Sequence, residues 1–468
     1  MVDKLRGVRS QDSVGGRDES KGAAKPERGS PPGSRSPEDK QADSLSRPNA
    51  DQVLRKSALP KSARRKTGKS SSSARLNASS EAKEALIRGY NSFTINLFDQ
   101  LFALYPGKNI FITIGIASGL LSIYNGADGT TRHAVAKALG LQGMNTEEAN
   151  AAHAEVVGTL SKKKAGAQLQ IANCLLVDKK VRLREDFLQR FSGEVIHHLG
   201  LTSPQMSTFI KEWVAEKTDN QVTDFDPSGD FNTKTLLALL TPAHFRGLWD
   251  IPFDRRDTKP GLFMSSTGKR KGLPFMFREG SFHHDYQDDH ELIRLHYKHR
   301  SISMRVFLPR VKHTLADVQH TLKDVQWDPG HFFQDLSRQF HNMHDLGEDK
   351  LYFPKFKVES ETDLTVPLAK LGMSELFTPM GANLSRMIAS PLPAHFGQAI
   401  QKGVLEVDEE GTTASDISSF AASLGEPSTI KVNRPFLTSV VHNKSNLILG
   451  LGSVVDPLAN GNGQPQSA

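Results

Sequence analysis

The sequence predicts an α+β protein whose helices and strands interleave along one large domain. Three observations support this prediction. Apolar residues recur at helical spacing in several segments, and short apolar runs typical of strands lie between those segments. Residues 1–80 differ sharply in composition from the rest of the chain, so the domain is expected to span residues 81–460. We find no internal repeat in it.

Residues 1–80 are expected to form a disordered basic tail rich in Ser and Pro. They contain six Pro and no Phe, Trp, Tyr or Ile, so they bury too little apolar surface to offset the entropy cost of ordering. The tail holds 18 Lys and Arg against 9 Asp and Glu. Its charge of +9 exceeds the +7 of the whole chain, which leaves about −2 for the remainder. Residues 461–468 are expected to be a disordered C-terminal tail.

The tail carries one dense basic cluster, which consists of Lys61, Arg64, Arg65, Lys66 and Lys69. Such a cluster is expected to bind nucleic acid, a heparin-like polyanion or anionic lipid, or to serve as a nuclear localisation signal. The alternative is a solvated spacer without a specific partner.

The sequence also bears on compartment. Cys174 is the single cysteine, so internal disulfides are excluded, and its apolar surroundings predict a small core residue and not a nucleophile. The first residues lack the apolar run of a secretory signal, and no stretch of about 20 residues is apolar enough to span a bilayer. The chain as written is therefore expected in the cytoplasm or nucleus, or outside the cell if its start site is misassigned.

Individual elements follow from local patterns. Phe93, Leu97, Leu101 and Leu104 recur at helical spacing and predict an amphipathic helix that ends at Pro106. Residues 116–124 lead into a turn at 126–131. The other helices are expected after that turn, at 209–218 with Trp213 facing inward, and at 363–372. Strands are expected at residues 109–112, 169–177, 236–240, 301–309, 351–357 and 447–457.

The most informative segment is a strand that runs directly into a long run of small residues. Val404 to Glu409 alternate with period two, and Gly411 offers a flexible pivot just beyond them. Residues 414–423 are mostly Ala and Ser, so this run is able to stay exposed as a loop or to fit between two strands without severe clashes.

These features, in this order, resemble the serpin family over about residues 84–458. The resemblance rests on the Glu409-Glu410-Gly411-Thr412 hinge, the Asn433-Arg434-Pro435-Phe436 strand start, the turn at 126–131, and the segments around Trp249 and Pro252. It implies a serpin fold with one large sheet, two smaller sheets and about nine helices, and a reactive-centre loop at about 409–432. It also implies a monomer without a cofactor.

The resemblance further implies a suicide inhibitor of serine proteases, trapped as a covalent acyl-enzyme when the cut loop inserts into the main sheet. We place the scissile bond between Leu424 and Gly425, with Ser423 as a fallback, because glycine fills no specificity pocket and leucine fills an apolar one. No Arg or Lys lies between Thr412 and Ile430, so chymotrypsin-, elastase- or subtilisin-like targets are expected. Cysteine cathepsins are a further class. The alternatives are a non-inhibitory serpin acting as chaperone or ligand carrier, and a polyanion-binding protein acting through its tail.

Several residues then take serpin roles. The hinge comprises Glu409, Glu410, Gly411, Thr412, Thr413, Ala414 and Ser415, the breach comprises Lys355, Glu409 and Trp249, and the shutter comprises Thr113, Thr241 and Gln401. Three polar shutter residues differ from the usual serpin ones, and a Gln–Thr–Thr cluster is expected to satisfy the buried groups. Asp416 is a misfit because it would be buried on insertion, so slower insertion is expected unless it is hydrogen-bonded or wet.

The sequence gives little support for an enzyme active site or a metal site. No Gly-x-Ser-x-Gly elbow is present, because Gly115 to Gly119 has the wrong spacing, so we expect no enzyme activity. Residues 283–290 contain His and Asp, but their spacing fits no standard metal site, and they are expected to form a polar hairpin between strands.

Overall fold

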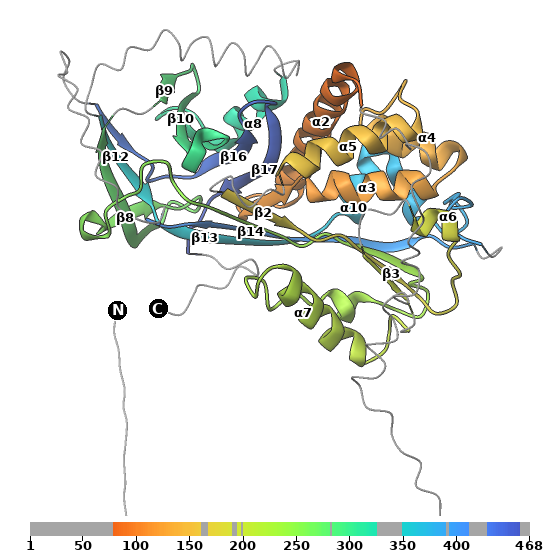
Figure 1. Cartoon of the computed structure of the whole chain (residues 1–468). Coiled ribbons are helices and arrows are strands. Elements are labelled where there is room, and N and C mark those ends of the chain that lie inside the picture. Colours follow the sequence, from red (N-terminus) through yellow and green to blue (C-terminus); the bar gives the residue numbers. More distant parts are fainter. Residues whose placement is uncertain are drawn as a thin grey trace, which may run out of the picture. The chain divides into compact units, whose positions relative to one another are not determined.

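The computed structural model describes residues 78–160, 167–189, 194–197, 200–280, 283–324, 349–389, 393–410 and 428–458 (Figure 1). The chain divides into two units, residues 1–67 and 68–468, and all described residues belong to the second. The predicted tails, apart from residues 78–80, and the basic cluster around Arg64 and Arg65 lie outside the described residues. None of the helices in these ranges is long and apolar enough to cross a membrane.

The described strands form three sheets, one large and two smaller, in agreement with the predicted α+β architecture. The large seven-stranded sheet contains β2 (Ala167–Ile171), β3 (Cys174–Val177), β4 (Glu194–His197), β5 (Leu237–Leu240), β6 (Ala243–Gly247), β13 (Phe356–Asp363) and β14 (Phe396–Val407). The six-stranded sheet contains β1 (Ile110–Thr113), β9 (His283–Tyr286), β10 (His290–His296), β11 (Ile302–Pro309), β16 (Phe436–His442) and β17 (Leu447–Val454). The third contains β7 (Lys259–Met264), β8 (Arg270–Gly280), β12 (Asp349–Pro354) and β15 (Thr429–Lys431).

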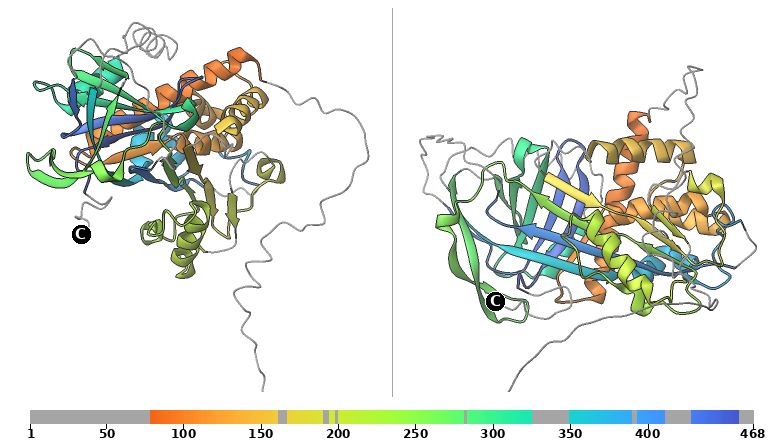
Figure 2. Two further views of the ribbon diagram at one scale, coloured as in Figure 1. Left: turned by 60° about the vertical axis from the view of Figure 1, so that its left-hand side comes forward. Right: turned by 60° about the horizontal axis from the view of Figure 1, so that its bottom comes forward.

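The helices cover both faces of the large sheet. The α-helices among the described residues are α2 (Ser80–Leu104), α3 (Gly115–Gly126), α4 (Gly129–Ala138), α5 (Thr146–Leu160), α6 (Glu185–Leu188), α7 (Gln205–Lys217), α8 (Leu315–Asp324) and α10 (Thr365–Leu368). Short helical turns are η2 (Pro227–Asp230), η3 (Arg255–Asp257), η4 (Lys298–Arg300), η5 (Ala369–Met373) and η6 (Ser374–Phe377). Helices α2, α3 and α5 lie on one side of the sheet, and α7 lies on the other (Figures 1 and 2).

The first helix extends the predicted one towards the N-terminus. Ser79 caps α2 by accepting a hydrogen bond from the Ala82 amide at 3.0 Å. Leu86, Phe93 and Leu97 are buried one or two turns apart, because the apolar stripe begins before Phe93. The helix therefore begins at Ser80, well before the first residue of the predicted apolar stripe.

Three predicted elements are corrected by the structure. The strand expected at residues 351–357 is divided between β12 and β13, which belong to two different sheets. Residues 169–177 form two strands instead of one, because the neighbouring chain is interrupted at Pro242, which has no amide hydrogen to donate to a ladder. The Ala172 amide donates to the Pro242 carbonyl at this break, so β2 pairs with β6 and β3 with β5. The predicted helix at 363–372 begins only at Thr365, and Gly372, with φ +93°, ends its regular part.

The polar hairpin predicted at residues 283–290 is present as antiparallel β9 and β10. No group of His, Cys, Asp and Glu side chains within the ranges given above could hold a metal ion.

The centre of the large sheet consists of parallel strands. Residues 396–400 of β14 pair with β5, and residues 403–405 pair with β6. On its other side β14 pairs antiparallel with β13 along eight residues in continuous register. The strand that leads into the predicted loop is therefore hydrogen-bonded on both sides within the described structure.

Candidate functional site at the root of the loop

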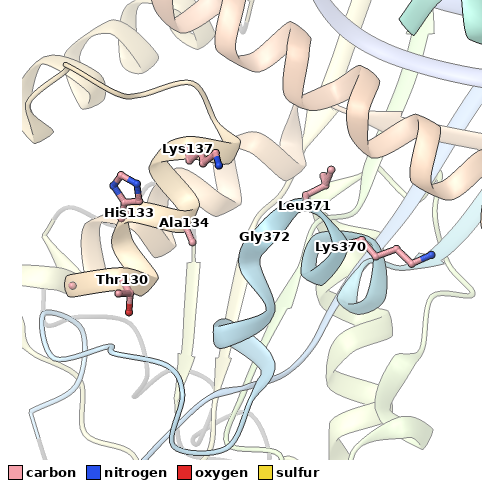
Figure 3. Close-up of a pocket in the computed structure, with 8 residues that line it drawn as sticks. Thr130, His133, Ala134, Lys137, Lys370, Leu371 and Gly372 are labelled. Atoms are coloured by element: carbon pink, nitrogen blue, oxygen red, sulfur yellow. The ribbon is translucent and has the colours of Figure 1, made fainter.

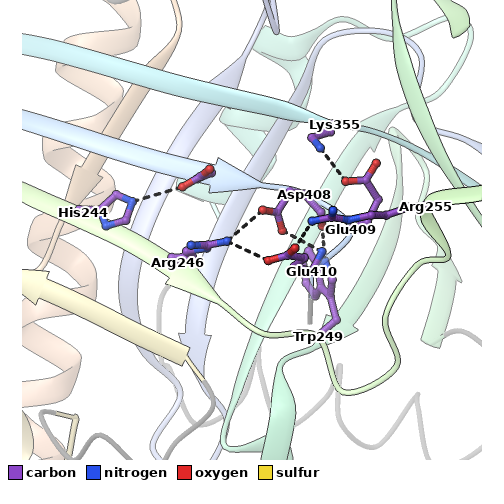
Figure 4. A network of polar contacts seen from close by, with 9 residues as sticks. His244, Arg246, Trp249, Arg255, Lys355, Asp408, Glu409 and Glu410 are labelled. Atoms are coloured by element: carbon purple, nitrogen blue, oxygen red, sulfur yellow. Dashed lines mark hydrogen bonds and ion pairs between the residues drawn. The ribbon is translucent and has the colours of Figure 1, made fainter. Parts of the chain in front are cut away.

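The chain leaves the large sheet at Asp408, Glu409 and Glu410, directly after β14 (Figure 4). The predicted hinge residues Gly411 to Ser415 and the predicted scissile residues Leu424 and Gly425 lie outside the described residues. The structure begins again at Ser428, just before β15 in the third sheet. The two described residues that flank the predicted loop therefore lie next to different sheets: Glu410 follows the large sheet, and Ser428 precedes the third sheet.

Glu409 is held by two donors. Its Oε2 lies 2.7 Å from Lys355 Nζ, and its Oε1 accepts a hydrogen bond from Thr258 Oγ1 at 2.8 Å (Figure 4). Only 5% of its side chain is exposed. Burial alone would raise the pKa of Glu409, but the hydrogen bonds from Lys355 and Thr258 outweigh it and the net shift is downward. The carboxylate is therefore a charged, fixed anchor.

Trp249 holds Asp408, the residue before Glu409. Its Nε1–H donates to the Asp408 carbonyl at 2.9 Å. The indole is fixed in turn by stacking on Tyr297 at 4.5 Å between ring centroids and by an edge contact with Phe253. The three residues predicted for the breach, Lys355, Glu409 and Trp249, are thus brought together at the end of β14, and their role in opening the sheet stays a prediction.

Two arginines at this site were missed by sequence reasoning. Arg246 Nη2 lies 3.2 Å from Asp408 Oδ2 and 3.4 Å from Glu410 Oε2, and Arg255 also pairs with Glu410 (Figure 4). Burial raises the pKa of Asp408, and Arg246 opposes this shift. The dense acidic run 406–410 was a signal that basic partners were needed, but which arginines face it depends on strand pairing that the sequence does not state.

The predicted shutter residues meet only in part. Gln401 Nε2 donates to Thr113 Oγ1 at 2.9 Å, but Thr241 bonds instead to the Ile400 carbonyl through its amide at 3.0 Å. Within the described part of the chain, Gln401 Oε1 is buried without a hydrogen-bond partner. The expected three-residue cluster is therefore a pair, and it satisfies fewer buried groups than the sequence suggested.

One further hollow lies apart from these residues. It has a volume of about 810 Å³ and lies between α4 and η5 (Figure 3). His133, Lys137 and Lys370 contribute its basic side chains. None of the predicted site residues lines it.

Replacing Lys355 by Met is expected to lower the free energy of unfolding by about 1–3 kcal/mol at pH 7, because buried Glu409 loses its cation. Since the folded pKa of Glu409 is lowered from 4.5, the contribution of the pair is complete above about pH 4.5 and is lost as pH falls further. Urea unfolding of both proteins between pH 3 and 8 measures this.

Lys350→Met is the matched control, because Lys350 on β12 pairs with a half-exposed Glu279 and should contribute little. A Lys355→Met loss that equals the control, or that does not shrink in acid, would contradict the prediction.

Comparison with known proteins agrees with this fold. Residues 88–457 match the family described as Serpin (serine protease inhibitor). Human neuroserpin is 26% identical over 383 residues, covering 78% of this chain and 90% of that protein. Plasminogen activator inhibitor 1 from Sus scrofa is 27% identical over 401 residues, covering 81% of this chain and 94% of that protein.

Among solved structures, native protease nexin-1 with heparin is similar, with a TM-score of 0.69 and 25% identity. The match covers 80% of this chain and 100% of that one. Because the family match extends over far more than half of the sequence, this chain is a member of the serpin family.

Proposed function

We propose that this protein inhibits serine proteases as a suicide substrate, with residues 411–427 as the bait loop. The observation that carries the proposal is the parallel pairing of β14 with β5 and β6. A segment that turns back after β14 runs antiparallel to β14, and therefore also to β5 and β6. Inserted between them, it would exchange one parallel ladder for two antiparallel ladders, which are the more stable kind per residue.

The free energy gained in this exchange is large enough to drive the displacement of a tethered protease. A serine protease attacks the loop through its activated hydroxyl and forms an acyl-enzyme. Roughly a dozen inserted residues, at about 1 kcal/mol for each new hydrogen bond, provide over about 10 kcal/mol. Insertion adds the cut loop to the large sheet as an extra strand and releases the strain stored in the intact protein. The tethered protease is displaced and distorted before water releases it.

Target class follows from the proposed scissile bond. Leu424 would enter an apolar specificity pocket, so chymotrypsin-, elastase- or subtilisin-like enzymes are the proposed targets. The hydrogen bond from Trp249 to Asp408 crosses the β6–β14 boundary and is proposed to hold its top closed, while Lys355 fixes Glu409 from the β13 side. The Thr113–Gln401 hydrogen bond is proposed to hold the middle of β14 against β1. In this role the protein acts as an inhibitor and not as a catalyst, which is also what the names of its relatives describe.

The proposal is tested on one gel. Mixed in turn with chymotrypsin, elastase, subtilisin and trypsin, the protein should form a complex that survives boiling in detergent with at least one of the first three. The same proteases with their active serine blocked are the control and should form none. Cleavage of the loop by all of them without any stable complex would favour a non-inhibitory serpin instead.

A second proposal concerns the tail. Its charge of +9, concentrated around Arg64 and Arg65, supports binding of a polyanion. A similar protein, protease nexin-1, has been crystallised with heparin. Deleting residues 1–77, which keeps the Ser79 cap of α2, should abolish retention on a heparin column and leave the protease complex unchanged.

A further inference from the structure

A buried lysine lies where the large sheet would have to open. In β14, Ile400, Lys402 and Val404 alternate with residues that face the other side of the sheet. Ile400 and Val404 pack in the apolar cluster beneath α7, so Lys402 lies on that face as well. Its side chain is only 2% exposed. Such a cation requires nearby carboxylates.

Three carboxylates surround Lys402. Its Nζ lies 3.2 Å from Asp224, 3.3 Å from Glu359 and 3.8 Å from Glu361. Glu359 and Glu361 belong to β13, and Glu361 is directly opposite Lys402 in the β13–β14 register. Asp224 belongs to the segment that follows α7. Lys402 therefore links β14 and β13 to the layer that is formed by α7 and the segment after it.

The layer around α7 spans the boundary between β5 and β14. Its apolar cluster contains Ala238 and Leu240 from β5 together with Ile400 and Val404 from β14. The segment holding Asp224 is packed into the same cluster through Val222 and Phe225. A strand inserted between β5 and β14 would move them apart by one strand spacing, about 4.8 Å. That displacement is longer than an ion-pair distance. The α7 layer therefore cannot keep all of its contacts to β5 and all of its contacts to β14.

We propose that the Asp224–Lys402 ion pair is a latch that ties the α7 layer to β14 and slows loop insertion. This inference rests on the proposed inhibitory function and names the contact that controls its slow step. Glu359 and Glu361 move together with Lys402 because their strand stays hydrogen-bonded to β14. Lys402 therefore remains paired after the latch opens, and only the exposed Asp224, which water solvates readily, loses its partner.

Asp224 also has an unfavourable interaction, which makes equilibrium stability a poor measure of the latch. Burial raises the pKa of Glu361, Lys402 opposes this shift, and the carboxylates of Asp224, Asp230 and Asp226 raise it further. Removing the charge of Asp224 thus loses an attraction and relieves a repulsion. The rate of opening, in contrast, depends on the contact that must break.

The test compares Asp224→Asn with Asp230→Asn. Asp230 lies in the same segment and repels Glu361 in the same way, but within the described residues it forms no ion pair with Lys402. A synthetic peptide with the sequence of residues 412–423 serves as the inserting strand, and its incorporation into the intact, full-length protein is followed by native gel and by thermal unfolding. No protease is involved.

Asp224→Asn should incorporate the peptide about threefold to tenfold faster than the parent, and Asp230→Asn should match the parent. Added salt should accelerate the parent more than Asp224→Asn, because Asp224 is exposed and salt therefore screens its attraction to Lys402. Equal rates and equal salt dependence in both variants would overturn the latch while leaving the proposed function intact. Failure of every protein to incorporate the peptide, together with the absence of a protease complex, would overturn both.

Discussion

Cleavage of the chain between Leu424 and Gly425 is expected to raise the midpoint of thermal unfolding by at least about 10 °C. The freed segment after Gly411 can then occupy the boundary at which β14 meets β5 and β6. A gain of about 10 kcal/mol from roughly a dozen ladder hydrogen bonds, at about 1–2 °C per kcal/mol for a domain of this size, gives a shift of about 10–20 °C. Ordinary nicking of a loop lowers stability, so even the sign is informative.

The measurement uses a catalytic amount of a metalloprotease such as thermolysin, which forms no acyl-enzyme and so cannot be trapped by the proposed mechanism. Mass spectrometry locates the cut near Leu424, and circular dichroism follows unfolding. A cut in the basic tail, for example after Arg65 by trypsin, is the matched control and should leave the midpoint unchanged. A loop-cut protein that melts at or below the intact one would show that no inserted form is accessible.

The order of elements could be predicted from sequence because each carries a local signal. The period of the apolar residues marks α2, and the alternation at 404–409 marks the end of β14. The division of residues 169–177 could not be predicted in this way. It depends on Pro242, which lies far along the chain and becomes its neighbour only when the sheet forms.

The candidate site, too, could be predicted only in part from the sequence. Lys355, Glu409 and Trp249 could be assigned because their motifs resemble a family in which these positions meet, and the structure brings them together. Arg246, Arg255 and the carboxylates around Lys402 gave no such signal, since surface charges are common in any sequence. Only the pairing of β13 with β14 and the packing after α7 select them as neighbours.

Replacing Thr412 by Arg is expected to abolish inhibition while the loop is still cut at the same rate. Thr412 follows the pivot Gly411, so it is the first side chain that the sheet must accept, and the family resemblance places it on the buried face. Arginine stays charged at any accessible pH, so its unpaired burial costs several kcal/mol. At about 1.4 kcal/mol for each factor of ten, a cost of about 4 kcal/mol slows insertion roughly a thousandfold.

Deacylation would then occur before insertion, and each encounter would release active protease and cut inhibitor. Thr412→Val is the control: it has a similar size, no charge and a high strand propensity, so it should keep the number of inhibitor molecules consumed per trapped protease near that of the parent. Titration of residual protease activity gives this number for all three proteins. If the Arg variant still trapped protease with parental stoichiometry, the first inserted position would have to lie elsewhere than Thr412, or trapping would not require insertion at all.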